Sequence, residues 1–490
     1  MKPKNFDQYT PTIGIECHVQ LNTATKLFSG ASNDERGQAP NMVTSPICFG
    51  LPGTLPVLNE KAIELAVKAA IALNAEVGKF SSFDRKHYFY PDLPKGYQIT
   101  QLHHPIILAG RLEVPVDGKT VTVRIHHAHL EEDAGKSSHP AGADYSLVDL
   151  NRAGTPLIEI VSEADMHSAT EAKAYVQELY LLMKYAGVTL GDLQHGNMRF
   201  DVNVSVSKTK ELGTRTETKN LNSFRAVEKA VEYEIKRQIE LLEKGQSIRQ
   251  ETRGWDDAKQ RTSPQRGKEE AQDYRYFPEP DLPPVELSDE QIAKWQLEMP
   301  KLPPQIRAEI EACGIDQASA EVMILQDALS GVGYVPTVLE VASEAGRDAA
   351  KFTANFLVHR DIKYRLDNPD PRAAVVPSAK QFETVFKLFS DRELSSNAVD
   401  QLLFLLKNDA EAGARQVAEE HNLLQENDTE SLKAIVRQVL DDPASQKAVA
   451  DIKAGETKAI GFLVGQVMKA SRGKANPAAV SELISEELKA

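Results

Sequence analysis

One segment near the amino terminus alternates groups that bind cations or transfer protons with apolar residues. Glu16 and His18 interleave with Ile15, Cys17 and Val19. Side chains two positions apart on a β-strand lie on the same face, so one face of this strand would be apolar and the other ionisable. A solvated strand face usually carries lysine, threonine, glutamate and serine in loose order. The pairing of glutamate with histidine therefore indicates a site.

Two later segments repeat this arrangement. In one, the alternating run 121–125 leads into Glu131 and Glu132. In the other, residues 198–206 alternate apolar side chains with a polar set that includes Asp201. Carboxylate oxygens are the ligands that hard divalent cations prefer. We therefore expect the three strands to form the walls of one reaction chamber that holds a metal ion.

Length and composition set the class of protein. The chain has 490 residues, more than one hydrophobic core usually organises, so two or three domains are expected. Its 41% hydrophobic and 26% charged residues are typical of globular proteins. No apolar run reaches the roughly 20 residues of a membrane helix, and residues 1–7 have no apolar signal core. We expect a cytoplasmic protein without a membrane segment.

Cysteine usage and net charge exclude further classes. Cys17, Cys48 and Cys313 are odd in number and include no C-x-x-C pair, which argues against a disulfide framework and against a thiolate zinc site. The formal net charge of -14 argues against a protein that coats nucleic acid through its overall field. The segment 453–474 nevertheless carries five basic residues against one acidic residue. A solvated surface is the alternative interpretation of this local basic cluster.

The chain changes character near residue 295. Before it, strand-like and turn-rich segments are interspersed with helices, one of them with a buried stripe over 172–183. A capping box of Ser168 and Glu171 would begin that helix, and Gly187 would end it. This half is predicted to be α+β, a mostly antiparallel sheet forming a cradle with helices.

After the proline-rich segment 298–304, nearly every periodic segment is helical, and the last helix begins behind Asn476 and Pro477. The carboxy-terminal half is therefore predicted to be all-α and divided once more. The expected domains are a cradle, a helical domain and a helical tail, at residues 1–295, 296–410 and 411–490.

Six ordered strings carry a resemblance to the B subunits of aspartyl/glutamyl-tRNA amidotransferases. They are residues 14–21, 83–92, 129–136, 148–160, 219–223 and 273–282. The string 461–470 is similar to the YqeY-like tail of that family, a region that can begin near residue 342. The resemblance covers essentially the whole chain, and ordered strings of this length are far more specific than a single glycine-rich loop.

The resemblance implies a two-step conversion of mischarged tRNA. The family phosphorylates the side-chain carboxylate of Glu-tRNA(Gln) or Asp-tRNA(Asn) with ATP, and ammonia then replaces the phosphate to leave an amide. Ammonia comes from a glutaminase A subunit through a protein channel, and a small C subunit clamps the two together. This chain would be the ATP-dependent carbon–nitrogen ligase of a heterotrimer.

The resemblance also implies roles for individual residues. The metal ligands would be Glu16, His18, Glu131, Glu132 and Asp201, holding Mg²⁺ or Mn²⁺. Imidazole is softer than Mg²⁺ prefers, so either Mn²⁺ or a position behind the ligands would suit His18 better. Many relatives resemble a zinc knuckle with paired cysteines near residue 48, where this chain has a single cysteine, so no zinc is expected.

Catalytic roles are expected for Lys86, Glu132 and Asp201, of which Lys86 would meet phosphate or guide ammonia. The alternative for Lys86 is a surface lysine beside structural aromatic residues.

Basic side chains are the candidates for binding phosphate. Arg152 and Lys219 would either clamp a phosphate of ATP or pair with Asp149 or Glu217. In the basic tail cluster, Lys469, Arg472 and Lys474 would meet the tRNA backbone, since tails of this family contact the outer body of tRNA.

Three histidines of one strand receive no role. His126, His127 and His129 form a cluster in sequence, yet adjacent residues of a strand point to opposite faces. Each is expected to be a packed or solvated histidine.

Two other functions stay open. The chain could be a noncatalytic tRNA-binding scaffold whose carboxylates hold a structural ion. It could also be a free-standing ATP-dependent ligase for a small carboxylic acid, although the helical tail and the missing ammonia source disfavour that interpretation.

Overall fold

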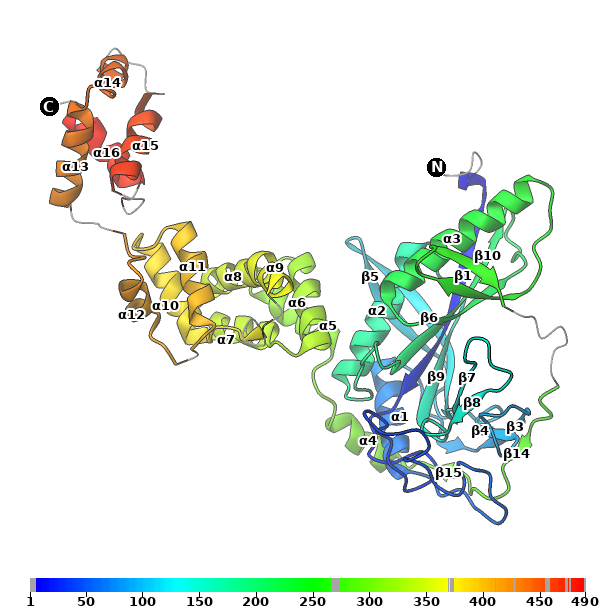
Figure 1. Ribbon diagram of the computed structural model, residues 1–490. Helices are drawn as coiled ribbons and strands as arrows, with labels where there is room; N and C mark the ends of the chain where they lie inside the picture. Colours follow the sequence, from blue (N-terminus) through cyan, green and yellow to red (C-terminus); the bar gives the residue numbers. More distant parts are fainter. Residues whose placement is uncertain are drawn as a thin grey trace. The chain divides into compact units, whose positions relative to one another are not determined.

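The computed structural model is an α+β protein that divides into two compact units, residues 1–303 and 304–490. It describes residues 6–265, 273–368, 370, 374–409, 411–425, 429–453, 459–471, 475 and 477–488. The first unit holds the strands and the second is helical, as predicted (Figure 1). The division of the helical half at residue 410 stays a prediction. No helix within the described ranges combines the length and apolar character needed to cross a membrane.

An eight-stranded sheet is the centre of the first unit. Its strand order is β13-β12-β11-β10-β1-β9-β6-β5. The strands are β1 (Thr10–Gln20), β5 (Gly110–Val116), β6 (Lys119–Glu132), β9 (Pro156–Ser162), β10 (Met198–Ser207), β11 (Thr216–Leu221), β12 (Thr252–Asp256) and β13 (Arg261–Pro264). All neighbours are antiparallel except β11 and β12. The prediction of a mostly antiparallel sheet is confirmed.

The apolar face of the sheet packs against two long helices. Ile13, Ile15, Cys17 and Val19 of β1 are at most 1% exposed. Helices α2 (Ala169–Tyr185) and α3 (Phe224–Glu243) contact each other, and α3 packs on β10 (Figure 1). The Phe224 ring lies between the two layers, with its centroid 5.3 Å from that of Tyr180 in α2 and 6.5 Å from that of Phe200 in β10. The opposite face is therefore left to the polar set.

Helix α2 begins as predicted, but its capping box is only half formed. The Ser168 hydroxyl accepts a hydrogen bond from the Glu171 backbone N–H at 3.1 Å. The Glu171 carboxylate accepts from the backbone N–H of His167 at 2.6 Å instead of that of Ser168. The helix ends before Gly187, whose φ of 71° is the left-handed conformation that glycine favours.

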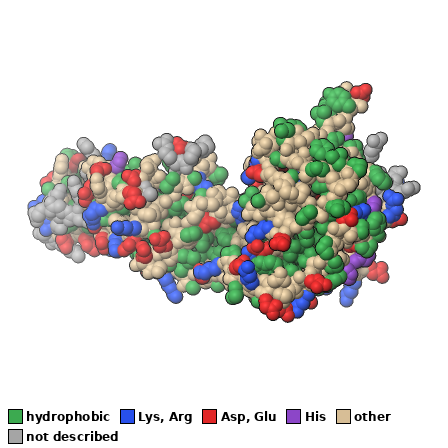
Figure 2. Space-filling model, turned by 90° about the horizontal axis from the view of Figure 1, so that it is seen from below, with side chains coloured by type: hydrophobic (Ala, Val, Ile, Leu, Met, Phe, Trp, Pro, Cys, Tyr) green, Lys and Arg blue, Asp and Glu red, His purple; other side chains and the backbone are tan. Residues whose placement is uncertain are grey.

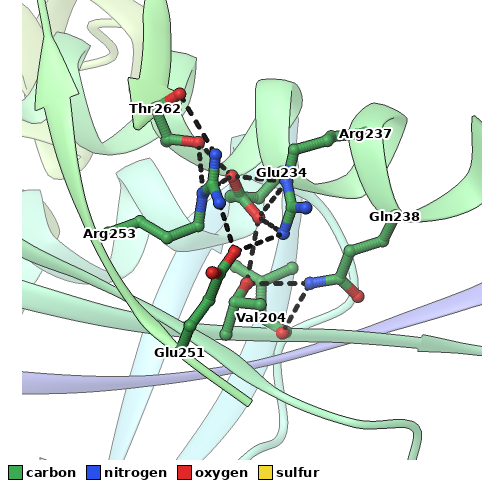
Figure 3. Close-up of polar contacts among 8 residues, drawn as sticks. Val204, Glu234, Arg237, Gln238, Glu251, Arg253 and Thr262 are labelled. Atoms are coloured by element: carbon green, nitrogen blue, oxygen red, sulfur yellow. Dashed lines mark hydrogen bonds and ion pairs between the residues drawn. The ribbon is translucent and has the colours of Figure 1, made fainter. Parts of the chain in front are cut away.

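A buried ionic network fastens α3 to the hairpin β12–β13 (Figure 3). The Glu234 carboxylate is fully buried and pairs with Arg237 at 2.8 Å and Arg253 at 3.0 Å, while the Thr262 hydroxyl donates to it. Burial by itself would raise the pKa of Glu234, but hydrogen bonds from Arg237 and Thr262 and both arginine charges lower it. The network therefore fixes the edge of the sheet beside β11.

Smaller sheets stand next to the main one. They have the orders β14-β3-β4, β15-β2 and β7-β8. Their strands are β2 (Phe80–Ser81), β3 (Asp84–His87), β4 (Tyr97–Thr100), β7 (Lys136–Ser138), β8 (Leu147–Asp149), β14 (Phe277–Pro278) and β15 (Val285–Glu286), with helices α1 (Glu60–Ala72) and α4 (Asp289–Leu297) alongside. Because β4 contacts β6, the strand β3 and its Lys86 are held close to the main sheet.

Helices are the main regular elements in the described part of the second unit. Its helices are α5 (Pro303–Ala312), α6 (Gln317–Ser330), α7 (Tyr334–Ala345), α8 (Arg347–Phe356), η2 (Leu357–Asp361), α9 (Ile362–Asp367), α10 (Ala379–Ser390), α11 (Ser396–Leu406), α12 (Ala414–Glu420), α13 (Thr429–Asp441), α14 (Gln446–Lys453), α15 (Ile460–Ala470) and α16 (Pro477–Glu487). The predicted stripes form the core of the last four helices, with Val436, Val467 and Ile484 fully buried. Helix α16 begins at Pro477 as predicted, and Asn476 lies outside the described residues.

Side chains of both charge signs are mixed over the surface. Figure 2 shows acidic and basic groups interspersed with apolar ones on one face, without a continuous field of either sign. This agrees with a protein that does not coat nucleic acid through its overall charge.

Candidate active site with two acidic clusters

Strand register brings residues from distant parts of the chain onto the polar face of the sheet. Glu16 in β1 lies directly opposite Asp201 in β10. On the other side of β1, His18 lies opposite Glu159 in β9. Glu159 in turn lies opposite His129 of β6, which is two positions before Glu131. Opposed residues on antiparallel strands share a face, as do residues two apart on one strand. The three predicted strands therefore meet, with β9 between two of them.

The first cluster consists of His18, Glu131 and Glu159. The Nε2 atom of His18 lies 3.6 Å from Glu131 Oε1 and 3.5 Å from Glu159 Oε2. One ligand atom from each of the three residues lies within 4.8 Å of the others, which is close enough to hold one metal ion. Sequence reasoning missed Glu159. Its signal was a single carboxylate in the otherwise apolar run 157–161.

Electrostatics in this cluster favour positive charge. Burial opposes protonation of His18, but the hydrogen bond to Glu159 and the charges of Glu131 and Glu159 raise its pKa to about 9. Burial also raises the pKa of Glu159, and the hydrogen bond from His18 and the neighbouring cations outweigh this and lower it. The protonated imidazole of His18 therefore offsets part of the negative charge of the cluster.

His129 joins this cluster, although sequence analysis assigned it no role. Its Nε2 atom lies 3.5 Å from Glu159 Oε2 and 3.8 Å from Glu131 Oε2. Its Nδ1 atom is buried and has no hydrogen-bond partner among the described residues. Because Nε2 is the atom near both carboxylates, this imidazole is a candidate for a further ligand.

The other two histidines contact each other, contrary to the expectation that adjacent strand residues diverge. The Nδ1 atoms of His126 and His127 lie 2.7 Å apart, and the His127 ring stacks on His129 with centroids 5.3 Å apart. The cause is an irregular register between β6 and β9 at residues 125–127, since a β-bulge re-aims side chains. Burial and the neighbouring imidazoles lower the pKa of His127 to about 4.

The second cluster consists of Glu16, Asp201 and Glu217. Its ligand atoms also lie within 4.8 Å of one another. Asn203 donates to Glu16 at 3.1 Å, and Lys219 pairs with Asp201 at 3.3 Å and Glu217 at 2.9 Å. Burial and the surrounding carboxylates raise the pKa of Glu16. Glu217 was considered only as a partner for Lys219, and that pairing is present beside its place in the cluster.

A backbone irregularity positions Asp201. The register between β10 and β11 shifts between Phe200 and Val202. Asn220, with a φ of 60°, donates its backbone N–H to Asp201 Oδ1 at 2.7 Å. Bulges are frequent next to active sites because they redirect one side chain without breaking the sheet.

Glu132 joins neither acidic cluster, and the other four predicted metal ligands divide between the two clusters instead of surrounding one ion. Its carboxylate pairs with Lys95 and accepts a hydrogen bond from the Ile99 backbone N–H at 3.0 Å. Consecutive residues of a strand point to opposite faces, so Glu131 and Glu132 cannot both face the clusters. The structure thus corrects the placement of Glu132 in one metal shell with Glu131.

Lys86 lies beside the first cluster. It is half-buried, and its Nζ atom is 4.9 Å from the centre of the Tyr274 ring. Burial lowers its pKa, but the charge of Glu131, followed by the tyrosines and Glu159, reverses this and raises it. This placement agrees better with a role at the cluster than with a surface lysine.

Arg152 has a partner that the sequence did not suggest. Arg152 pairs with Asp133 and not with Asp149 or Glu217, the two carboxylates predicted as partners. Arg199 also pairs with Asp133, at 3.1 Å. Burial would raise the pKa of Asp133, and the two arginines lower it. Arg152 lines a cavity of about 630 Å³ together with Lys136 and other polar residues. Its role in binding phosphate stays a prediction.

A second cavity, of about 610 Å³, lies beside the second cluster. Glu16 and Asn203 line it, and Arg215 provides a cation. The carboxylate of Glu16 thus belongs both to the wall of this cavity and to the second cluster, whereas no residue of either cluster lines the cavity beside Arg152.

The predicted tRNA contacts are only partly described. Lys469 is exposed near the end of α15, whereas Arg472 and Lys474 lie outside the described residues. All three cysteines are free thiols, in agreement with the absence of a disulfide framework.

Comparison with known proteins decides the family. A family model for the GatB/GatE catalytic domain matches residues 11–293, and a model for the GatB domain matches residues 337–488. The chain belongs to the GatB family. The polar face with both clusters therefore lies within the catalytic-domain match, and α15 lies within the second match.

Curated members of the GatB family match over nearly their whole length. The B subunit of the aspartyl/glutamyl-tRNA(Asn/Gln) amidotransferase of Geotalea daltonii is 43% identical over 98% of this chain and 99% of the relative. B subunits of the same name from Janthinobacterium sp. (strain Marseille) and Neisseria meningitidis serogroup C are each 44% identical, over 99% and 97% of this chain and 100% and 98% of the relatives. The resemblance inferred from the six strings is confirmed.

Proposed function

We propose that this chain is the kinase and transamidase subunit of a glutamine-dependent tRNA amidotransferase. It would phosphorylate the side-chain carboxylate of Glu-tRNA(Gln), Asp-tRNA(Asn) or both with ATP, and then let ammonia displace the phosphate. The observation that carries the proposal is the meeting of two acidic clusters on one sheet face, in a chain whose relatives are amidotransferase B subunits.

The chemistry explains why such a site is needed. A carboxylate is a poor electrophile, and ammonia cannot expel its oxygen, whereas an acyl phosphate carries a good leaving group. Phosphoryl transfer requires in-line positioning of the reactants and neutralisation of phosphate charge. Mg²⁺ or Mn²⁺ would supply that neutralisation when bound.

The donor sets fit divalent cations. His18, Glu131 and Glu159 combine an imidazole with two carboxylates, which suits Mn²⁺ better than Mg²⁺. Glu16, Asp201 and Glu217 provide oxygen ligands alone, which suits either ion. The zinc knuckle of many relatives is not part of the proposal, because the segment around Cys48 has no second cysteine.

The residues around the clusters would position the reactants. We assign the ATP phosphates to the cavity lined by Glu16 and Arg215. Lys219, paired with Asp201 in the cluster that includes Glu16, would provide a further cation near it. Lys86 would approach the first cluster from β3 and hold the acyl phosphate oxygen or the incoming ammonia. Its raised pKa supports a positive charge for the first of these tasks.

The proposed assembly follows from the reaction. Ammonia would come from a glutaminase A subunit, a small C subunit would hold the complex together, and aminoacyl-tRNA would be the substrate. Since that substrate belongs to translation, the proposed compartment is the cytoplasm.

One experiment separates this enzyme from a noncatalytic scaffold. Asp201→Ala in the reconstituted complex should reduce ATP-dependent phosphorylation of mischarged tRNA by orders of magnitude, even at saturating tRNA. A scaffold would retain the chemistry once binding is saturated. Asp256→Ala, at the half-exposed end of β12 in the same sheet, is the matched control and should retain the wild-type rate.

A further inference from the structure

Lys26 is buried in an unusual way. Its side chain is 1% exposed, although lysine is almost never fully buried unless paired with a carboxylate. Its Nζ atom donates to the Ala153 carbonyl at 2.7 Å and lies 3.5 Å from the Leu150 carbonyl. Within the described part of the chain it forms no ion pair. The amine is therefore held by neutral groups and stands apart from the two acidic clusters.

The remaining neighbour of the amine is a thiol. Lys26 Nζ lies 3.5 Å from the Sγ atom of Cys48, which is 5% exposed. That sulfur also lies 3.3 Å from the Ser45 hydroxyl and 3.3 Å from the Ala153 carbonyl. Two nucleophilic groups thus lie in direct contact in the interior of the first unit.

The environment favours a reactive amine. Burial lowers the pKa of Lys26, and the nearby sulfur and carboxylates offset this only in part. A larger share of the amine is then neutral and has a free lone pair than for an exposed lysine.

A narrow cavity borders the sulfur. It has a volume of about 10 Å³, and its largely apolar wall includes Cys48 and the polar residues Ser29, Lys95 and Glu132. A space of this size is close to that of a single water molecule, so only a very small oxidant such as hydrogen peroxide is a suitable candidate.

We infer that Lys26 and Cys48 form a site of reversible oxidative cross-linking, in which the amine condenses with an oxidised sulfur to give a direct Nζ–Sγ bond. A sulfenic acid condenses with nitrogen in this way when a suitable amine or amide is adjacent. The inference concerns residues outside the proposed catalytic chemistry and does not depend on it.

The two steps balance with hydrogen peroxide as the oxidant. In the first, the sulfur of Cys48 attacks peroxide, the O–O bond breaks, an S–O bond forms, and one water leaves. The sulfur loses two electrons, which reduce the peroxide. In the second, the Lys26 lone pair attacks the sulfur, the S–O bond breaks, and the hydroxide leaves with an amine proton as a second water. The protein loses two hydrogen atoms in total.

Mass spectrometry of the full chain tests this directly. The protein is treated with hydrogen peroxide, its free thiols are alkylated, and it is digested with trypsin. The expected product joins peptides 5–36 and 37–61, with no cleavage after Lys26 and a mass two hydrogen atoms below their sum. A thiol reductant added before digestion should abolish it.

Variants identify the two atoms. Cys48→Ser and Lys26→Arg should each remove the linked product, and Cys313→Ser, at a thiol elsewhere in the chain, should leave it unchanged. If Lys26→Arg does not fold, the missed cleavage in the wild-type product still identifies the amine.

Several outcomes would overturn the inference. They are a Cys48 that is only further oxidised without a link, a link that retains an oxygen atom, and a product cleaved after Lys26, which would be a disulfide between Cys17 and Cys48.

Discussion

Glu131 and Glu132 are neighbours in sequence, yet their carboxylates lie on opposite sides of β6. Glu131 Oε1 is 3.6 Å from the imidazole of His18, whereas Glu132 is buried against Lys95. The alternation of a strand therefore separates two acidic residues that look equivalent in sequence. One belongs to a candidate metal cluster, and the other belongs to a buried ion pair.

These two glutamates should give opposite phenotypes. Glu131→Gln should weaken Mn²⁺ binding by about 100-fold, because it removes a charged ligand, with little loss of stability. Glu132→Gln should retain Mn²⁺ affinity but lower the free energy of unfolding by about 3 kcal/mol, because Lys95 is left as an uncompensated buried charge. Paramagnetic resonance titration of Mn²⁺ and urea unfolding measure the two effects. Equal Mn²⁺ affinities of the two variants would contradict the division.

His129 should behave as a ligand and His126 should not. His129→Ala should reduce Mn²⁺ affinity by about tenfold, since its Nε2 atom faces both carboxylates of the first cluster. His126→Ala is the matched control, because its imidazole contacts His127 and none of the cluster carboxylates. The same titration applies, and a loss of similar size in both variants would remove His129 from the ligand set.

The Glu234 network should make the first unit sensitive to acid. The folded-state pKa of Glu234 is lowered, so its stabilisation is present above the ordinary value of 4.5 and is lost as pH falls through the folded-state value. Glu234→Gln should cost about 3 kcal/mol at pH 7, because Arg253 and Arg237 lose their buried carboxylate partner and keep only the more exposed Glu251, and the difference from wild type should shrink in acid.

Tryptophan fluorescence measures this effect in the first unit alone, because both tryptophans, Trp255 and Trp295, lie there. Glu240→Gln, at an exposed position of α3, serves as the control and should change stability little. A difference in the free energy of unfolding between wild type and Glu234→Gln that stays constant from pH 7 to pH 4 would contradict the ionic role of Glu234.

The tail should contribute salt-dependent tRNA affinity. Charge reversal of Lys469, Arg472 and Lys474 to Glu should weaken tRNA binding and reduce the slope of log affinity against log salt by roughly one per lost phosphate contact. Glutaminase activity of the complex should not change. Lys447→Glu, at an exposed position of α14, is the control. Unchanged tRNA affinity in the triple variant would exclude this surface.

Much of the site could be predicted because a strand reports its faces in its own sequence. Alternation alone placed Glu16, His18 and Asp201 on polar faces, and the structure joins those faces through β1. Glu159 was missed because the residues on both sides of it in β9 are apolar. A strand that is buried between its neighbours shows no alternation of polar and apolar residues around a single carboxylate. The register that brings β9 between β1 and β6 is a long-range property that no local pattern contains.

The error at residues 131–132 has a different cause. Both glutamates were assigned to the metal by the family resemblance, although a regular strand can present only one of them to a given face. The prediction that His126 and His127 diverge was wrong for the opposite reason. The bulge at residues 125–127 brings together side chains that a regular strand would separate. Bulges depend on pairing across strands and leave little trace in sequence.

The most direct measurement of the central claim is single-turnover phosphorylation of mischarged tRNA by the reconstituted complex carrying Glu159→Gln. Glu159 lies between the two imidazoles of the first cluster, at 3.5 Å from each. Glu113→Gln, at an exposed position of β5 in the same sheet, is the control. The account predicts that the acyl phosphate forms at least about 100-fold more slowly in the first variant and at the wild-type rate in the second. A wild-type rate in Glu159→Gln at saturating ATP and tRNA would contradict it.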